Sequence, residues 1–274
     1  MKNTRRILTA LGALLTACCM SLLLPIGASA KTKTLEQMYG TLQGSTRGYE
    51  AIQARISGNK LTIDAYVNFK GSYNTRLGGQ SRAALAKKGI RLWAGSYAGN
   101  RYDFEPGMAF TVAVNIHDIY NGARARGGQN YLDFVCKSGI AASYTFQGVG
   151  YYNRELIGTY SGAIPDRSYR CGSMVIYSGL KSRYYTANQY VKVCAHEFGH
   201  VLGLGDLYDK GLASTKECPQ IRSKYYVEGD IMGTHGRVTP NNIEMFLEAY
   251  RTNQYQAYVN SHLPETKSPV IRSY

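Results

Sequence analysis

The sequence of 274 residues predicts an α/β (α+β) fold with a twisted mixed sheet. The first observation is the order strand, helix, strand at residues 60–69, 81–93 and 107–116. The second is a long helix that begins after Thr186 and separates its apolar and polar residues onto two faces. The third is a final amphipathic helix after residue 239.

Each of these elements follows from a local pattern. Residues 60–69 alternate apolar and polar side chains, which is typical of a half-buried strand. The apolar members are Leu61, Ile63, Ala65, Val67 and Phe69. Residues 81–93 offer an apolar helical side despite Gly89, and residues 107–116 are rich in Phe and Val. Residues 139–146 and 173–177 predict two further short strands.

The two later helices carry recognisable start signals. Thr186 and Gln189 form a Thr-x-x-Gln capping box at the beginning of the first. Thr239 and Pro240 provide the cap and first-turn residue of the second. Its apolar positions recur at three- and four-residue steps and are Ile243, Phe246, Leu247 and Tyr250.

The first 30 residues have the features of an export signal. A basic start is followed by an apolar stretch at residues 7–26 and by the small-residue site Ala28-Ser-Ala30. Pro25 supports cleavage after Ala30 and disfavours a retained membrane span. The box ending at Cys18 also fits lipoprotein processing, but the apolar stretch continues past it. We therefore expect a secreted, extracellular protein rather than a lipid-anchored one.

The remaining chain is expected to form one domain. Residues 31–58 are polar and glycine-punctuated and predict a lead-in or short prosegment, and residues 59–274 predict the folded domain. No second apolar run is long enough for a transmembrane segment. The formal charge is +14, and loss of the three leader cations leaves +11. We expect a monomer that attracts acidic substrates or anionic cell-surface polymers. Scattered cations argue against nucleic acid.

The central helix carries a metal-binding pattern. His196 and His200 are four residues apart, so both rings project from one side of a helix and can hold a single zinc ion. Glu197 lies beside the position of the water that such an ion activates. Gly203 permits a sharp break in chain direction that brings Asp206 back as the third ligand.

Other side chains compete for the third position. Asp209 and Glu228 are carboxylates at other spacings, and His235 follows the Met-Gly turn at Met232. We favour Asp206 because of its fixed distance from the glycine break. Met232 is expected to pack as an apolar floor, because a thioether is a poor zinc ligand beside His and Asp.

This set of residues resembles the metzincin clan of zinc metallopeptidases. The shared pattern comprises the two histidines, Glu197, Gly203, a third ligand three residues later and the Met232 turn. Histidine is the usual third ligand, so Asp206 is a departure that is similar to snapalysin-type and immune-inhibitor-A-type secreted peptidases. The resemblance covers residues 186–250. It implies a two-lobed catalytic domain with a smaller, mostly helical C-terminal lobe that the final helix braces. It also implies that residues 173–177 form an edge strand for substrate, although an ordinary sheet strand fits these residues equally.

The implied activity is a secreted zinc endopeptidase acting on proteins or peptides. Zinc would acidify a bound water, and Glu197 would be the general base that passes its proton to the departing amine. Two alternatives stay open. One is a zinc-bearing binding or adhesion protein without turnover, and the other is a hydrolase of cell-wall peptide cross-links.

Four cysteines remain after the leader is removed. They are Cys136, Cys171, Cys194 and Cys218. Export permits disulfides, and three pairings are possible. We favour Cys194 with Cys218, which would tie the central helix to the loop after the metal ligands.

Overall fold

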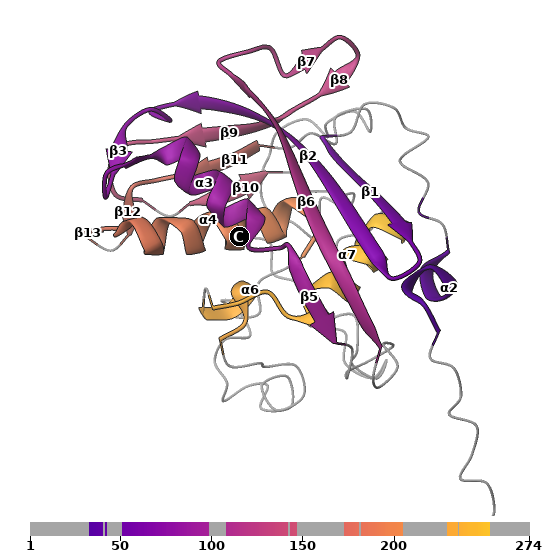
Figure 1. The fold of residues 1–274 in the computed structure, drawn as a ribbon. Helices are drawn as coiled ribbons and strands as arrows, with labels where there is room; N and C mark the ends of the chain where they lie inside the picture. Colours follow the sequence, from indigo (N-terminus) through magenta and orange to yellow (C-terminus); the bar gives the residue numbers. More distant parts are fainter. Residues whose placement is uncertain are drawn as a thin grey trace, which may run out of the picture. The chain divides into compact units, whose positions relative to one another are not determined.

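The described chain forms a seven-stranded mixed sheet with two helices packed side by side on one face (Figure 1). The computed structural model describes residues 33–40, 42, 51–98, 108–141, 143–146, 173–180, 182–204, 229–234 and 236–252. From Thr34 onward these residues belong to one compact unit. The predicted α+β content is confirmed at this level.

Parallel strands occupy the middle of the sheet and antiparallel strands lie beside them. The path runs through β10 (Tyr144–Phe146), β11 (Ser173–Ile176), β9 (Leu132–Cys136), β2 (Lys60–Gly71), β6 (Ala109–Tyr120) and β5 (Gly95–Ala98). The strand β1 (Ile52–Ser57) pairs with the first half of β2, and β9 pairs with its second half. Since β6 occupies the whole other edge, the long strand β2 joins all parts of the sheet.

Short hairpins and helices complete the described structure. The hairpins are β3 (Arg76–Leu77) with β4 (Gln80–Ser81), β7 (Ala125–Arg126) with β8 (Gln129–Asn130), and β12 (Gly179–Leu180) with β13 (Arg183–Tyr184). The helices are α2 (Leu35–Tyr39), α3 (Arg82–Arg91), α4 (Ala187–Val201), α6 (Ile231–Thr234) and α7 (Pro240–Thr252). Within the described ranges, no helix combines the length and apolar character needed to cross a bilayer.

The alternating apolar side chains of β2 are buried, as predicted. All five predicted apolar residues, from Leu61 to Phe69, are fully buried in the hydrophobic core. The final helix α7 is also confirmed, and its Ile243, Phe246 and Leu247 belong to the same core. The predicted helix at residues 81–93 is α3, which begins after its N-cap Ser81.

Part of the segment expected as a lead-in, residues 31–58, belongs to the folded structure. Residues 52–57 form β1 inside the sheet, with Ile52 and Ile56 buried, and the backbone N–H of Ala54 donates to the hydroxyl of Tyr250 on α7 at 3.1 Å. The short helix α2 is held against the β1–β2 turn, because Glu36 accepts a hydrogen bond from Gly58 N at 2.6 Å. The sequence pattern did not predict these elements, because the segments between them are rich in glycine and polar residues.

The strand at residues 173–177 is an inner strand and not the edge that the resemblance implied. Here β11 pairs with β9 on one side and with β10 on the other. Of the described strands, β10 therefore forms this edge of the sheet. The helix α4 packs against both β10 and β11.

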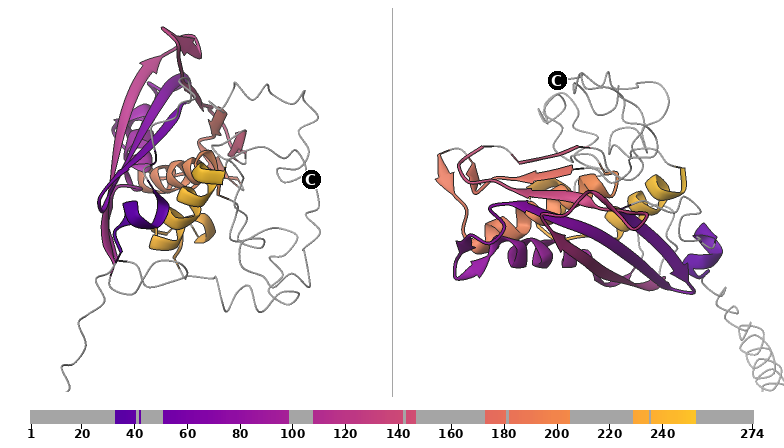
Figure 2. Two further views of the ribbon diagram at one scale, coloured as in Figure 1. Left: turned by 90° about the vertical axis from the view of Figure 1, so that its right-hand side faces the viewer. Right: turned by 90° about the horizontal axis from the view of Figure 1, so that it is seen from above.

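The two helices on the sheet approach each other closely (Figures 1 and 2). Gly89 of α3 lies against α4, where a Cβ atom would come within 2.5 Å of Val191 O and 2.6 Å of Cys194 Cβ. Just beyond α3, the indole N–H of Trp93 donates to Ala195 O at 2.9 Å. The absent side chain of Gly89 thus lets α3 support the middle of α4 directly.

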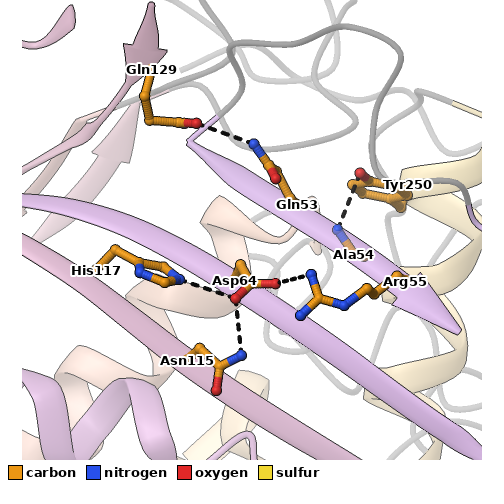
Figure 3. A network of polar contacts seen from close by, with 8 residues as sticks. All are labelled: Gln53, Ala54, Arg55, Asp64, Asn115, His117, Gln129 and Tyr250. Carbon is orange, nitrogen blue, oxygen red and sulfur yellow. Dashed lines mark hydrogen bonds and ion pairs between the residues drawn. The ribbon is translucent and has the colours of Figure 1, made fainter. Parts of the chain in front are cut away.

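The opposite face of the sheet carries a polar network (Figure 3). The buried Asp64 carboxylate accepts hydrogen bonds from Arg55 at 2.6 Å, Asn115 at 2.9 Å and His117 at 3.0 Å. The His117 ring also stacks on Tyr66, with centroids 4.5 Å apart. Burial favours a higher pKa for Asp64, but the His117, Asn115 and Arg55 contacts together lower the pKa below its ordinary value.

We expect Gly89→Ala to destabilise the protein by about 1 to 3 kcal/mol, because the new methyl group must separate α3 from α4. A glycine-to-alanine change in an open helix position would stabilise instead, by about 0.4 to 1 kcal/mol. Urea unfolding measures the difference. Lys88→Ala, an exposed neighbour, is the control and should change stability by less than about 0.5 kcal/mol. A Gly89→Ala protein more stable than wild type would contradict the close packing.

We expect Asp64→Asn to weaken the acid dependence of stability. Because the folded pKa of Asp64 is lowered, its contribution is present above the unfolded pKa of about 3.9 and is lost as pH falls through the folded value. At pH 7 the variant should lose about 1 to 2 kcal/mol, and the difference from wild type should shrink below pH 4. Unfolding curves from pH 2 to 7 measure this. Asp118→Asn, on a more exposed carboxylate, should have a smaller effect.

Candidate functional site

The helix α4 begins where its capping box predicts. Thr186 Oγ1 accepts from Gln189 N at 3.2 Å, and Gln189 Oε1 accepts from Thr186 N at 2.9 Å. These reciprocal bonds satisfy donors that a helix start leaves open. They fix the first turn of the helix about ten residues before His196.

The apolar stripe of α4 is confirmed, but the opposite face of the helix is also largely buried. Four residues of the predicted stripe are fully buried, namely Cys194, Ala195, Phe198 and Leu202, while Val191 is only partly buried. His196 and Glu197 are 1% and 6% exposed, and His200 is partly buried. The histidine and glutamate side chains therefore lie in a largely dehydrated environment.

Each histidine of the motif is oriented by a backbone carbonyl. His196 Nδ1 lies 2.8 Å from Ile231 O, and His200 Nδ1 lies 2.7 Å from Leu204 O. Since a carbonyl oxygen can only accept, both Nδ1 atoms must carry the proton. The lone pair of each neutral ring is then on Nε2, which is the arrangement that holds a metal-ligating imidazole.

The two imidazole rings lie close together. Their centroids are 4.9 Å apart and their planes are nearly perpendicular, at 86°. The spacing of four residues on α4 produces this closeness, because such residues lie one above the other on the same helix face. The geometry and the donor chemistry both fit two nitrogen ligands of one zinc ion.

The glycine break after His200 has the predicted form. Gly203 has φ +94°, and the helix ends in a Schellman motif in which Leu204 N donates to Gly199 O and Gly203 N donates to His200 O, both at 3.0 Å. The same turn presents the carbonyl of Leu204 to the His200 ring. The end of the helix and the orientation of its second histidine therefore depend on one turn.

The methionine turn supports the helix from the other side. Met232 on α6 is fully buried, as expected for an apolar floor. It packs on Gly199, where a Cβ atom would overlap with the Met232 sulfur and lie 2.9 Å from Trp93 Cζ2. The absence of a side chain at Gly199 thus brings α6 close enough for Ile231 O to reach His196.

A buried carboxylate holds this turn in place, and sequence reasoning did not assign it a role. Asp230 accepts hydrogen bonds from Met232 N at 2.8 Å, Thr239 Oγ1 at 3.1 Å and Asn242 Nδ2 at 3.1 Å. Burial raises the pKa of Asp230, although these three donors oppose the rise. The network links α6 to the start of α7. Asp230 and Asn242 are twelve residues apart, and no local sequence pattern predicts a contact over this separation.

The structure brings together His196, Glu197 and His200 and describes no third ligand. Asp206, Asp209, Glu228 and His235 all lie outside the described residues. Among the residues that are described, no group of three or more His, Cys, Asp or Glu side chains is positioned to hold a metal ion. The role of Asp206 stays a prediction.

The cysteines do not pair in the described structure. Cys136 and Cys194 are buried free thiols, and burial raises the pKa of Cys136 to about 11. The bond favoured between Cys194 and Cys218 is not formed at Cys194, which is completely enclosed by the core. Cys171 and Cys218 lie outside the described residues.

Comparison with known proteins adds no assignment. A scan of the chain against protein-family models finds no match, and a search of curated protein sequences finds no significant match. The site must therefore be interpreted from its own geometry.

If His196 and His200 bind zinc, Gly203→Ala should weaken that binding about tenfold, because a residue with a Cβ strains the turn that presents Leu204 O to His200. Competition with a fluorescent zinc chelator measures the affinity. Gly58→Ala is the matched control, since Gly58 also has a positive φ, +57°, but lies in the β1–β2 turn with open space around it. Both changes should cost about 1 kcal/mol of stability. Equal zinc affinities in the two variants would argue against the proposed role of the turn.

Proposed function

We propose that the chain is a secreted zinc-dependent endopeptidase of metzincin type. His196 and His200 are proposed as zinc ligands together with Asp206, and Glu197 as the general base. The observation that carries the proposal is the pair of Nδ1 to carbonyl bonds, which comes from two separate turns and assigns the Nδ1 proton in both rings, as in imidazoles that bind a metal through Nε2. A buried histidine packed only for stability needs neither this tautomer nor a second histidine beside it.

The proposed reaction assigns the proton transfer to Glu197. Its carboxylate is adjacent to His196 on α4 and is nearly buried, so it acts in a low-dielectric environment. Glu197 accepts the proton of the attacking water and returns it to the departing amine. Bound zinc would supply Lewis acidity toward the water and the scissile carbonyl.

The environment of Glu197 includes a partly buried phenol. The pKa of Tyr185 is raised, first by burial and then by the negative charge of Glu197. Tyr185 therefore stays neutral and keeps its hydroxyl proton at physiological pH. The described chain thus gives the Glu197 carboxylate a polar, uncharged neighbour near the start of α4.

Substrate is proposed to add to the sheet edge beside α4. An extended peptide can pair with an exposed strand through backbone hydrogen bonds. We assign this role to β10, since β11 is enclosed between β9 and β10. The two-lobed division, with α7 bracing the lower lobe, belongs to the same proposal.

The decisive experiment compares Glu197→Gln with wild type. Zinc content is measured in the purified protein, and hydrolysis is assayed on an unfolded protein such as casein and on peptidoglycan cross-link peptides. We expect one zinc per chain in both proteins. We also expect the Gln variant to lose about 10²- to 10⁴-fold in kcat/KM, because it keeps the shape of the side chain and removes the base. Glu248→Gln, a surface carboxylate paired with Arg251, is the control and should leave the rate unchanged.

The outcomes separate the alternatives. Zinc without hydrolysis of any substrate would favour a binding or adhesion protein. Hydrolysis confined to cross-link peptides would favour the cell-wall enzyme, for which the formal charge of +14 is suited to an anionic wall. Full activity in Glu197→Gln would refute the assignment of the base.

A further inference from the structure

An arginine is buried at the first position of α3. Arg82 follows the N-cap Ser81 and is only 7% exposed. Two effects disfavour its positive charge at this position. Burial removes water from the guanidinium, and the N-terminal end of a helix already carries partial positive charge. The first turn of α3 contains no acidic residue to offset either effect.

Among the described residues, the Arg82 guanidinium lacks a carboxylate partner. One of its terminal nitrogens, Nη1, donates to Ser138 Oγ at 3.4 Å, which is a weak contact. Its buried Nε has no hydrogen-bond partner. Buried arginines are ordinarily paired, so an orphaned donor of this kind indicates a missing acceptor.

The neighbouring thiol and phenol do not supply the missing negative charge. The charge of Arg82 lowers the pKa of both Cys136 and Tyr190, but burial outweighs it and raises both values. Each group is therefore neutral at physiological pH. The backbone donors at the start of α3 are also used within the chain, since Arg82 N donates to Thr75 O and Ala83 N donates to Tyr73 O, both at 3.0 Å.

A pair of serine hydroxyls lies next to the buried guanidinium, since Ser138 contacts both Arg82 and Ser72. Ser72 follows β2 and Ser138 lies two residues after β9, and because these strands are parallel their carboxyl ends meet at one edge of the sheet. The hydroxyls are 3.2 Å apart, and Ser138 is exposed to solvent. The carboxyl edge of parallel strands is a common place for ligands.

We propose that Arg82, Ser72 and Ser138 form a binding site for a small oxyanion, either a carboxylate or a phosphate. The planar fork of a guanidinium matches such an anion, and the two serine hydroxyls can donate to its remaining oxygens. The bound anion neutralises Arg82 and links the start of α3 to the end of β9. This site is separate from the proposed zinc centre and does not depend on it.

The test measures thermal unfolding of the purified protein in sodium chloride, acetate or phosphate at constant ionic strength. For wild type, the midpoint should rise with acetate or phosphate concentration and then saturate. Arg82→Met should show only the general salt response, and it should be at least as stable as wild type in the absence of the oxyanion. Arg91→Met, at the exposed end of the same helix, should respond as wild type does. The more effective salt identifies the anion as carboxylate or phosphate.

A second variant keeps the proposal testable if Arg82→Met does not fold. Arg82→Lys keeps the charge and loses the fork, so its half-saturating anion concentration should rise at least tenfold. Isothermal titration of the same anions into wild type and Arg82→Lys gives an independent value. Identical salt responses in wild type, Arg82→Met and Arg82→Lys, together with no measurable heat of binding, would overturn the proposal.

Discussion

The proposed centre depends on two hydrogen bonds from imidazole N–H groups to backbone carbonyls. Ile231 O fixes the ring of His196 and Leu204 O fixes the ring of His200. A side-chain partner could rotate away, whereas these carbonyls belong to turns that are themselves hydrogen-bonded and packed. The backbone of α6 and of the turn that ends α4 thus sets the orientation of both rings, and this pre-organises the site.

Glycines in α3 and α4 let the neighbouring elements pack close enough for the bond between His196 and Ile231 O. Gly89 lets α3 lie against α4, and Gly199 lets Met232 and Trp93 lie against the backbone of α4 between the two histidines. The carboxylate of Asp230 then locks the turn that carries Ile231. With larger side chains at these two glycine positions α4 would stand further from both neighbours, and His196 would lack its carbonyl acceptor, Ile231 O.

The sequence predicted the elements whose signals are local. The alternation in β2, the capping box at Thr186 and the glycine at 203 each reside in a short window, and each has the expected structural result. The strand β6 extends to Tyr120, beyond the predicted end at Ile116, because backbone pairing with β2 continues through polar residues that break the apolar pattern. Local composition cannot report pairing of this kind.

Features that join distant segments escaped prediction. The inner position of β11, the inclusion of β1 in the sheet and the Asp230 network with Thr239 and Asn242 all depend on which segments meet in space. The unpaired Nε of Arg82 was also not predicted, because the sequence of α3 has the pattern of an ordinary amphipathic helix. In the site itself, the helix and its two histidines were predictable, while the carbonyls that orient them were not.

The attachment of α2 to the β1–β2 turn restricts how far the N-terminal part of the chain can be trimmed. Leu35 is in the core, its backbone N–H donates to Asn59 Oδ1 at 2.8 Å, and Glu36 is bound to Gly58. A protease that removed β1 as well would leave six residues of β2 without their strand partner. Unpaired backbone groups of this kind at a sheet edge promote aggregation. Trimming that preserves these contacts must therefore stop upstream of Thr34.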